Sequence, residues 1–252
     1  MELNISLAPN ILFYLGGLPI TNTLLWGFVI SMVLILFTLW IRYSLKPVPG
    51  RTQNIVELLL LGGYSFVKST IGSDKKARRI FPLVFTMFIF ALVANLAVYI
   101  PGQAAITLHK AEGVVPVFRA VMSDYGMVFI MTLITFLLTQ IIAIIVHGPF
   151  GYLGKFLNFK SPLQFFLGIM DIISELAKVI SLSFRLFGNI FAGEVLGAVM
   201  LFLAPFFIPL PFMFLGLLTA TVQAFVFAVL TLVFVSMASD INEDELVENA
   251  TI

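Results

Sequence analysis

The pattern of apolar and polar positions divides most of the chain into long apolar stretches. A helix needs about 20 apolar residues to cross a bilayer core of about 30 Å, and the stretches 23–41, 81–100 and 126–147 meet this need. Two further stretches, 163–204 and 206–239, would measure about 63 Å and about 51 Å as helices. Because these lengths exceed the thickness of the bilayer core, both helices must tilt strongly or break.

A sixth stretch, 54–72, is apolar but carries Glu57 and Lys68. It predicts an amphipathic helix that lies in the membrane interface. The proline-rich segment 205–211 predicts a helix stop between the last two stretches. The pattern therefore predicts an all-α integral membrane protein in a single membrane domain. It has five transmembrane crossings and an interfacial helix, and it ends in a hairpin of two long tilted helices.

The composition agrees with a membrane protein and excludes several functions. Hydrophobic residues make up 60% of the 252 residues and charged residues 11%, whereas soluble domains carry roughly 25% charged residues. A net charge of +1 predicts no nucleic-acid partner. The chain has no Cys and only two histidines, His109 and His147, so we expect no metal site. Motifs for nucleotide binding or hydrolysis are missing from the sequence, and we expect no cofactor.

The basic residues predict the orientation of the chain in the membrane. Eight of them lie in 42–79 and two in 155–160, and all ten fall on one side of the predicted spans. Only Lys110 and Arg119 fall on the other side. Because basic loops stay in the cytoplasm, we expect residues 1–22 to be external. The acidic tail 240–252 is then cytoplasmic.

The 163–204 stretch contains polar residues that an ordinary membrane helix lacks. They are Asp171, Glu175, Lys178, Arg185, Asn189 and Glu194. At about 100° per residue, the first five fall within roughly 80° of one another and form one stripe. Glu194 lies about 140° from Asn189 and faces another neighbour. Ionisable residues inside a membrane cost at least a few kcal/mol each, so they indicate a functional site.

Some of these residues have a structural alternative, but Arg185 is hard to explain that way. Near the cytoplasmic end, Asp171, Glu175 and Lys178 could reach water, and Glu175 and Lys178 could form an ordinary i,i+3 pair. Arg185 lies near the middle of its helix, away from carboxylates of that helix, and keeps its proton. Gln223 is roughly level with Arg185 if the hairpin closes at the prolines. It could make a simple interhelical hydrogen bond or belong to the same site.

Two motifs resemble a known family. They are Ser181-Leu-Ser-Phe-Arg185-Leu-Phe-Gly-Asn189-Ile-Phe-Ala-Gly-Glu194 and Gln223-Ala-Phe-Val-Phe-Ala-Val-Leu-Thr. Over about residues 170–239 the chain resembles subunit a of the F-type ATP synthase in its bacterial form. The resemblance implies a stator subunit in the inner membrane of a bacterium that is not an enzyme on its own. It would pass protons through two offset half-channels to and from the carboxylates of a rotating c-ring, coupling ion flow to ATP synthesis. The implied partners are the c-ring, the b subunits of the peripheral stalk and membrane lipid.

The resemblance also implies roles for residues. Arg185 matches the essential arginine and Gln223 the glutamine opposite it. Asn189 and Glu194 match the outer half-channel. Asp171 and Lys178 match the cytoplasmic one, to which we also assign Glu175. Some relatives place a His seven residues before the glutamine. This chain has Gly216 there, so Glu194 would relay with water or another group.

Three alternatives remain to be weighed against this interpretation. A secondary ion-coupled transporter would show internal repeats or paired broken helices, which the sequence lacks. The stator of another rotary motor would share tilted charged helices but not the run Arg185-Leu-Phe-Gly-Asn189. An intramembrane enzyme would need a Ser/His or paired Asp arrangement on facing spans.

Overall fold

The computed structural model describes residues 9–100, 106–110, 113–156, 162–203 and 207–250. Residues 1–8 of the predicted external segment, 251–252 of the predicted tail and Pro205 of the predicted helix stop lie outside the described residues. The described part contains the α-helices α1 (Asn22–Ser44), α2 (Arg51–Ile71), α3 (Asp74–Leu96), α4 (Tyr125–Phe156), α5 (Pro162–Leu203) and α6 (Pro209–Ala250).

Five of the helices are long and apolar enough to cross a membrane. They are α1, α3 with the turn that follows it as far as Tyr99, α4 as far as Ile145, α5, and α6 as far as Ala238. The helix α2 is not among them, and its place in the interface stays a prediction. The chain is therefore an all-α multi-pass membrane protein that ends in a pair of long helices.

Hydroxyl side chains inside the apolar helices bond to their own backbone. Ser31 Oγ donates to the Gly27 carbonyl at 2.8 Å, and Thr38 Oγ1 donates to the Leu34 carbonyl at the same distance. This satisfies the hydroxyl groups where water is absent. At the start of α1, Thr21 Oγ1 accepts a hydrogen bond from the backbone N–H of Leu24 and caps the helix.

The helix α4 extends beyond the predicted span 126–147. It bends at Gly148, which has φ of 75°, and continues to Phe156. A positive φ costs little at glycine because glycine has no Cβ. The chain therefore changes direction directly after the apolar run ends.

Two short antiparallel hairpins were not predicted from the sequence. Strands β1 (Ile11–Leu15) and β2 (Leu18–Thr21) are joined by Gly16 and Gly17, with φ of 57° and 89°. Positive φ at both central residues is typical of a type I′ turn. Strands β3 (Thr107–Lys110) and β4 (Gly113–Pro116) pair in the same way, so that His109 lies in a strand. These strands are too short for hydrophobic periodicity to reveal them.

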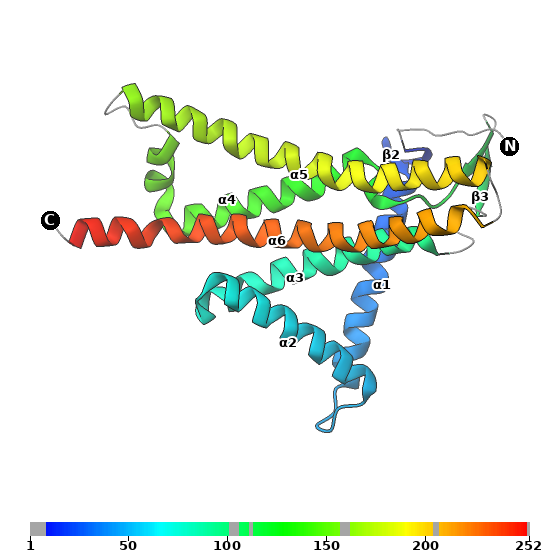
Figure 1. The fold of residues 1–252 in the computed structure, drawn as a ribbon, viewed down its shortest axis with the longest axis horizontal. Helices are drawn as coiled ribbons and strands as arrows, with labels where there is room; N and C mark the ends of the chain where they lie inside the picture. The colour runs from blue at the N-terminus through cyan, green and yellow to red at the C-terminus, as the bar shows by residue number, and fades with distance from the viewer. Residues whose placement is uncertain (1–8, 101–105, 111–112, 157–161, 204–206, 251–252) are drawn as a thin grey trace.

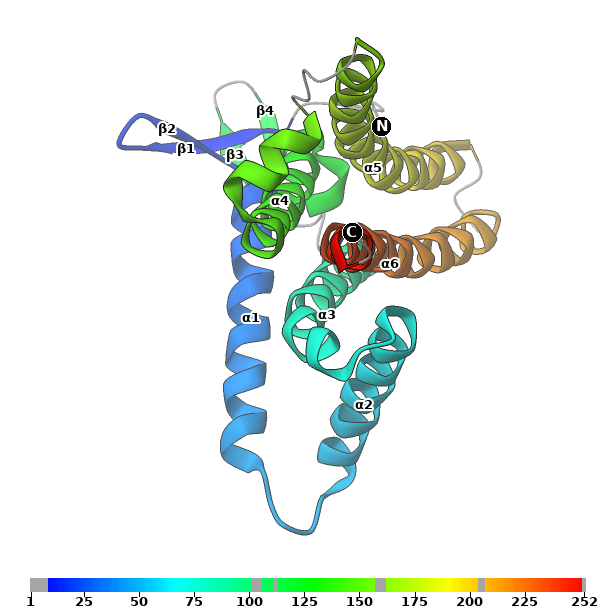
Figure 2. The same ribbon diagram turned by 90° about the vertical axis from the view of Figure 1, so that its left-hand side faces the viewer.

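The helices α3, α4, α5 and α6 pack around a common core. Small residues such as Ala91, Ala94, Ala220 and Ala224 let the helices approach closely around Phe227. In Figure 1, α5 and α6 lie side by side along the longest axis, and α1 runs across their direction. Figure 2 shows α1 and α5 on opposite sides of the bundle. Because these helices differ so much in direction, they cannot all stand upright in one bilayer.

Candidate functional site

The first polar cluster lies on the N-terminal half of α5. Lys178 Nζ lies 2.7 Å from Glu175 Oε1, and both side chains are largely buried. The amide of Gln140 on α4 donates to Glu175 Oε2 at 3.2 Å, and the hydroxyl of Tyr152 hydrogen-bonds to Gln140 Oε1. Burial raises the pKa of Tyr152, with a smaller contribution from the negative charge of Glu175. The i,i+3 pair considered from the sequence is present, and its Glu175 also accepts a hydrogen bond from a second helix, α4.

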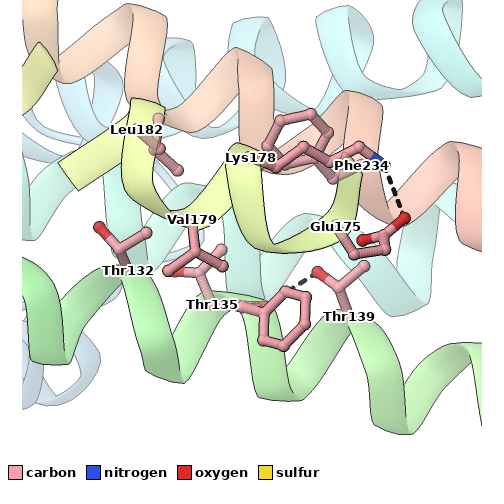
Figure 3. A pocket seen from close by; sticks show the side chains of 9 residues that line it. Thr132, Thr135, Thr139, Glu175, Lys178, Val179, Leu182 and Phe234 are labelled. Carbon is pink, nitrogen blue, oxygen red and sulfur yellow. Dashed lines mark hydrogen bonds and ion pairs between the residues drawn. The ribbon is translucent and has the colours of Figure 1, made fainter. Parts of the chain in front are cut away.

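A small cavity of about 20 Å³ adjoins this ion pair (Figure 3). Three buried threonines of α4 line it: Thr132, Thr135 and Thr139. Thr135 Oγ1 and Thr139 Oγ1 donate to carbonyls one turn earlier in α4, whereas Thr132 Oγ1 is buried and has no hydrogen-bond partner in the described part of the chain. The volume suits about one water molecule. Asp171, one turn before Glu175, is half-buried and forms no ion pair with described residues.

Arg185 projects from the exposed face of α5. Its neighbours Leu182, Ser183 and Leu186 are buried against the bundle. Ser183 Oγ donates to the Val179 carbonyl at 2.7 Å. Arg185 itself is exposed and makes no hydrogen bond or ion pair with the residues that the structure describes. The site thus presents a permanent cation in the polar stripe of α5.

One turn beyond Arg185, α5 and α6 are joined by a hydrogen bond. Asn189 Nδ2 donates to Gln223 Oε1 at 2.7 Å. Gln223 is buried with 4% of its surface exposed, and its Nε2 has no hydrogen-bond partner among the described residues. The structure therefore places Gln223 against Asn189, and no hydrogen bond joins Gln223 to Arg185.

A larger cavity of about 210 Å³ lies beyond this hydrogen bond, where the ends of α3, α5 and α6 meet. Its polar lining residues are Asn95, Tyr99, Asn189 and Glu194. Glu194 Oε1 lies 3.9 Å from Nε of Arg119, a largely buried side chain in the segment between β4 and α4. Glu194 Oε2 and Asn95 Oδ1 are buried and have no hydrogen-bond partner in the described residues. Glu194 therefore faces a cavity on one side and a cation on the other.

Sequence reasoning missed several polar residues of this region. From the sequence, Arg119 contributes only to the predicted orientation, and Asn95 is one residue of the predicted span 81–100. Asp124 directly precedes α4 and is buried, where Thr23 Oγ1 donates to its Oδ2 at 2.6 Å. A lone amide inside an apolar run and an acid directly before one are signals that could have drawn attention to Asn95 and Asp124. The sequence holds no comparable signal for Arg119, since its partner is 75 residues away in the chain.

The fold and these polar clusters define an α-helical multi-pass membrane protein that carries ionisable groups within its apolar helices. The family model described as ATP synthase A chain matches residues 24–236, which is most of the chain. The chain belongs to this family.

Curated relatives from several bacteria agree with this assignment. The ATP synthase subunit a of Moorella thermoacetica is 34% identical over 228 residues, covering 90% of this chain and 95% of the relative. The protein of the same name from Campylobacter concisus is 34% identical over 86% of this chain and 88% of the relative. The ATP synthase subunit a of Geobacter sulfurreducens is 33% identical over 85% of this chain and 86% of the relative. The recognition made from the motifs is therefore confirmed at the level of the family.

Proposed function

We propose that this chain is the proton-translocating stator subunit a of an F-type ATP synthase in a bacterial inner membrane. It passes protons to and from the carboxylates of a rotating c-ring and is not itself the catalyst of ATP synthesis. The membership of the family and the curated relatives named ATP synthase subunit a support this function. The proposed partners are the c-ring, the b subunits of the peripheral stalk and the surrounding lipid.

The observation that carries the proposal is Arg185. It is a permanent cation in a helix that is long and apolar enough to cross a membrane, it is exposed, and it makes no ion pair with described residues of its own chain. A charge in that position costs at least a few kcal/mol in a bilayer unless a partner or water meets it. The carboxylate of a neighbouring subunit would meet this need. Gly188, one turn away, has no atom within 4 Å of an added Cβ, so another helix has room to approach.

Polar groups lie on both sides of Arg185 along α5. Toward the N-terminus of α5 are Glu175 and Lys178, paired at 2.7 Å, and Asp171, which we assign together to the cytoplasmic half-channel. Toward its C-terminus are Asn189 and Glu194, which line the cavity of about 210 Å³. With Gln223, these form the outer half-channel. The two paths are offset along the helix, with Arg185 between them.

This arrangement couples ion movement to rotation by electrostatics. A ring carboxylate that faces lipid must be neutral, because an ionised one would be prohibitively costly there. Beside Arg185 the ionised form is favoured, because a nearby cation lowers the pKa of a carboxyl group. A carboxylate therefore passes Arg185 only after releasing its proton to one path, and it re-enters lipid only after taking a proton from the other. The membrane potential supplies about 2.3 kcal/mol per charge per 100 mV.

The test is to compare Arg185→Ala with Arg79→Ala, which removes an exposed arginine at the start of α3. ATP-driven proton pumping and passive proton permeability are measured in vesicles that contain the assembled complex. We expect Arg185→Ala to abolish pumping and raise passive permeability, because the carboxylate could then exchange with both paths. Arg185→Lys should lose most pumping, since a Lys removed from water in the membrane can lose its proton and become neutral. Normal coupled pumping by Arg185→Ala would refute the proposed function.

A further inference from the structure

The space beside Gly216 is occupied by a side chain from another helix. Gly216 lies in α6, and a Cβ built on it would overlap the hydroxyl oxygen of Tyr99 and lie 3.4 Å from Tyr99 Cζ. Tyr99 ends the 3-10 turn Ala97–Tyr99 that follows α3. Any side chain at position 216 would therefore compete with the Tyr99 hydroxyl for the same place. The Tyr99 hydroxyl can occupy this place because position 216 has no side chain.

The register of α3 against α6 holds Tyr99 in this position. One turn earlier, Asn95 Nδ2 donates to the Ala220 carbonyl at 3.0 Å. Asn95 is fully buried, and Ala220 lies one turn after Gly216 in α6. Because the two segments run in opposite directions here, the same register that joins Asn95 to Ala220 places Tyr99 at Gly216. The hydroxyl position is thus set by a buried hydrogen bond and not by the tyrosine alone.

Three polar groups without partners face the same cavity. Tyr99, Asn95 and Glu194 line the cavity of about 210 Å³. The Tyr99 hydroxyl makes no hydrogen bond with described residues, and Asn95 Oδ1 and Glu194 Oε2 likewise have no partner there. Polar groups removed from bulk water are costly unless they are hydrogen-bonded. The volume is far above the roughly 10–15 Å³ that one water molecule needs, so several waters can join these groups.

We propose that Tyr99 is a positioning residue of the outer half-channel that holds the water chain leading to Glu194. This rests on the proposed function. Arg119 lies 3.9 Å from the other carboxylate oxygen of Glu194 and leaves Oε2 to the cavity. The Tyr99 hydroxyl can accept a hydrogen bond from one water molecule and donate a hydrogen bond to the next. Tyr99 supplies this hydroxyl group from the turn that follows α3, in the space that a side chain at 216 would otherwise fill.

The experiment separates the hydroxyl group from the packing of the ring. Tyr99→Phe removes only the hydroxyl group, and without that group a Cβ at position 216 no longer overlaps the ring side chain. Tyr99→Phe/Gly216→Ser then returns a hydroxyl to the same place from α6, whereas Tyr99→Phe/Gly216→Ala fills the space without one. Tyr43→Phe, an exposed tyrosine at the end of α1, is the control for loss of a hydroxyl elsewhere. ATP-driven proton pumping in vesicles is normalised to the amount of assembled complex.

We expect Tyr99→Phe to lower the pumping rate about fivefold, the rate equivalent of losing one hydrogen bond. The Ser double variant should return to within about twofold of the wild type, while the Ala double variant stays near Tyr99→Phe. Wild-type pumping by Tyr99→Phe would overturn the proposal, as would equal recovery by the Ala and Ser double variants. Arg185→Ala is measured alongside. If Arg185→Ala is inactive while Tyr99→Phe pumps normally, only this inference fails, and if Arg185→Ala pumps normally, the proposed function itself fails.

Discussion

The hydrogen bond between Asn189 and Gln223 joins α5 to α6 one turn beyond Arg185, and it allows a quantitative prediction for Gln223→Leu. Asn189 Nδ2 donates to Gln223 Oε1 at 2.7 Å, and a neutral hydrogen bond contributes about 0.5–1.5 kcal/mol net. Gln223 also buries an Nε2 group without a partner among the described residues, which costs about 1–3 kcal/mol. Leu removes both the favourable contact and the unpaired donor. We therefore expect the substitution to leave assembly of the complex nearly unchanged.

The effect of Gln223→Leu on proton pumping should also be modest, because the substitution removes one neutral hydrogen bond. If the amide acts by orienting Asn189, its loss should lower ATP-driven pumping by about fivefold, the equivalent of about 1 kcal/mol. Asn189→Ala should have a similar effect. Because the two residues act through one hydrogen bond, the double variant should be little worse than either single variant. Gln164→Leu, at the exposed start of α5, is the matched control.

Pumping rates of the two single variants and the double variant, per assembled complex, give the coupling energy directly. Fully additive losses would show that Asn189 and Gln223 act independently, contrary to the observed hydrogen bond. A complete loss in Gln223→Leu, as severe as that expected for Arg185→Ala, would show that the amide touches the reacting groups themselves. Either result would refute the reasoning that Gln223 serves chiefly to orient Asn189.

Two further predictions concern stability and orientation. Asp124 is buried, caps the start of α4 through the Gly126 N–H at 2.9 Å and accepts from Thr23 at 2.6 Å, so Asp124→Ala should destabilise the fold by about 2–4 kcal/mol. The midpoint of thermal unfolding of the detergent-solubilised complex should fall for Asp124→Ala and much less for Asp124→Asn, and equal midpoints for Ala and wild type would contradict the role of the cap. Lys46→Cys, in the exposed connection between α1 and α2, should react with a membrane-impermeant thiol reagent in inverted vesicles but not in intact cells. Labelling in intact cells would reverse the predicted topology, and the absence of native Cys makes the result unambiguous.

The lengths of the membrane helices could be predicted from the sequence because the cost of placing a residue in lipid is nearly local. Each apolar run of about 20 residues lowers the free energy of insertion without help from the rest of the fold. The apolar parts of α1, α3, α5 and α6 follow from this, as does the unusual length of α5, whereas α3 begins before and α6 ends after its predicted apolar stretch. The polar stripe on α5 is likewise a property of one helix, since it depends only on the angle between successive residues.

The partners of the polar residues depended on the tertiary structure. In a membrane, the face of a helix that meets lipid is as apolar as the face that meets another helix, so the hydrophobic pattern does not indicate which face is buried. The sequence places Gln223 roughly level with Arg185 if the hairpin closes at the prolines, and the structure supplies its hydrogen-bond partner, Asn189, one turn beyond Arg185. Glu175 forms the local pair with Lys178 and also reaches Gln140 of α4, which no spacing within α5 could predict.

The cavity of about 210 Å³ shows most clearly which features the sequence determined and which the tertiary structure determined. The sequence by itself determined that Glu194 lies in an apolar helix and that position 216 has no side chain. Only the tertiary structure brought Arg119 to Glu194 and the hydroxyl of Tyr99 to Gly216. These contacts join residues that are 75 and 117 positions apart in the chain, and they depend on the relative register and direction of packed helices. Helix formation is decided within one segment, whereas register is decided by close packing among several segments at once.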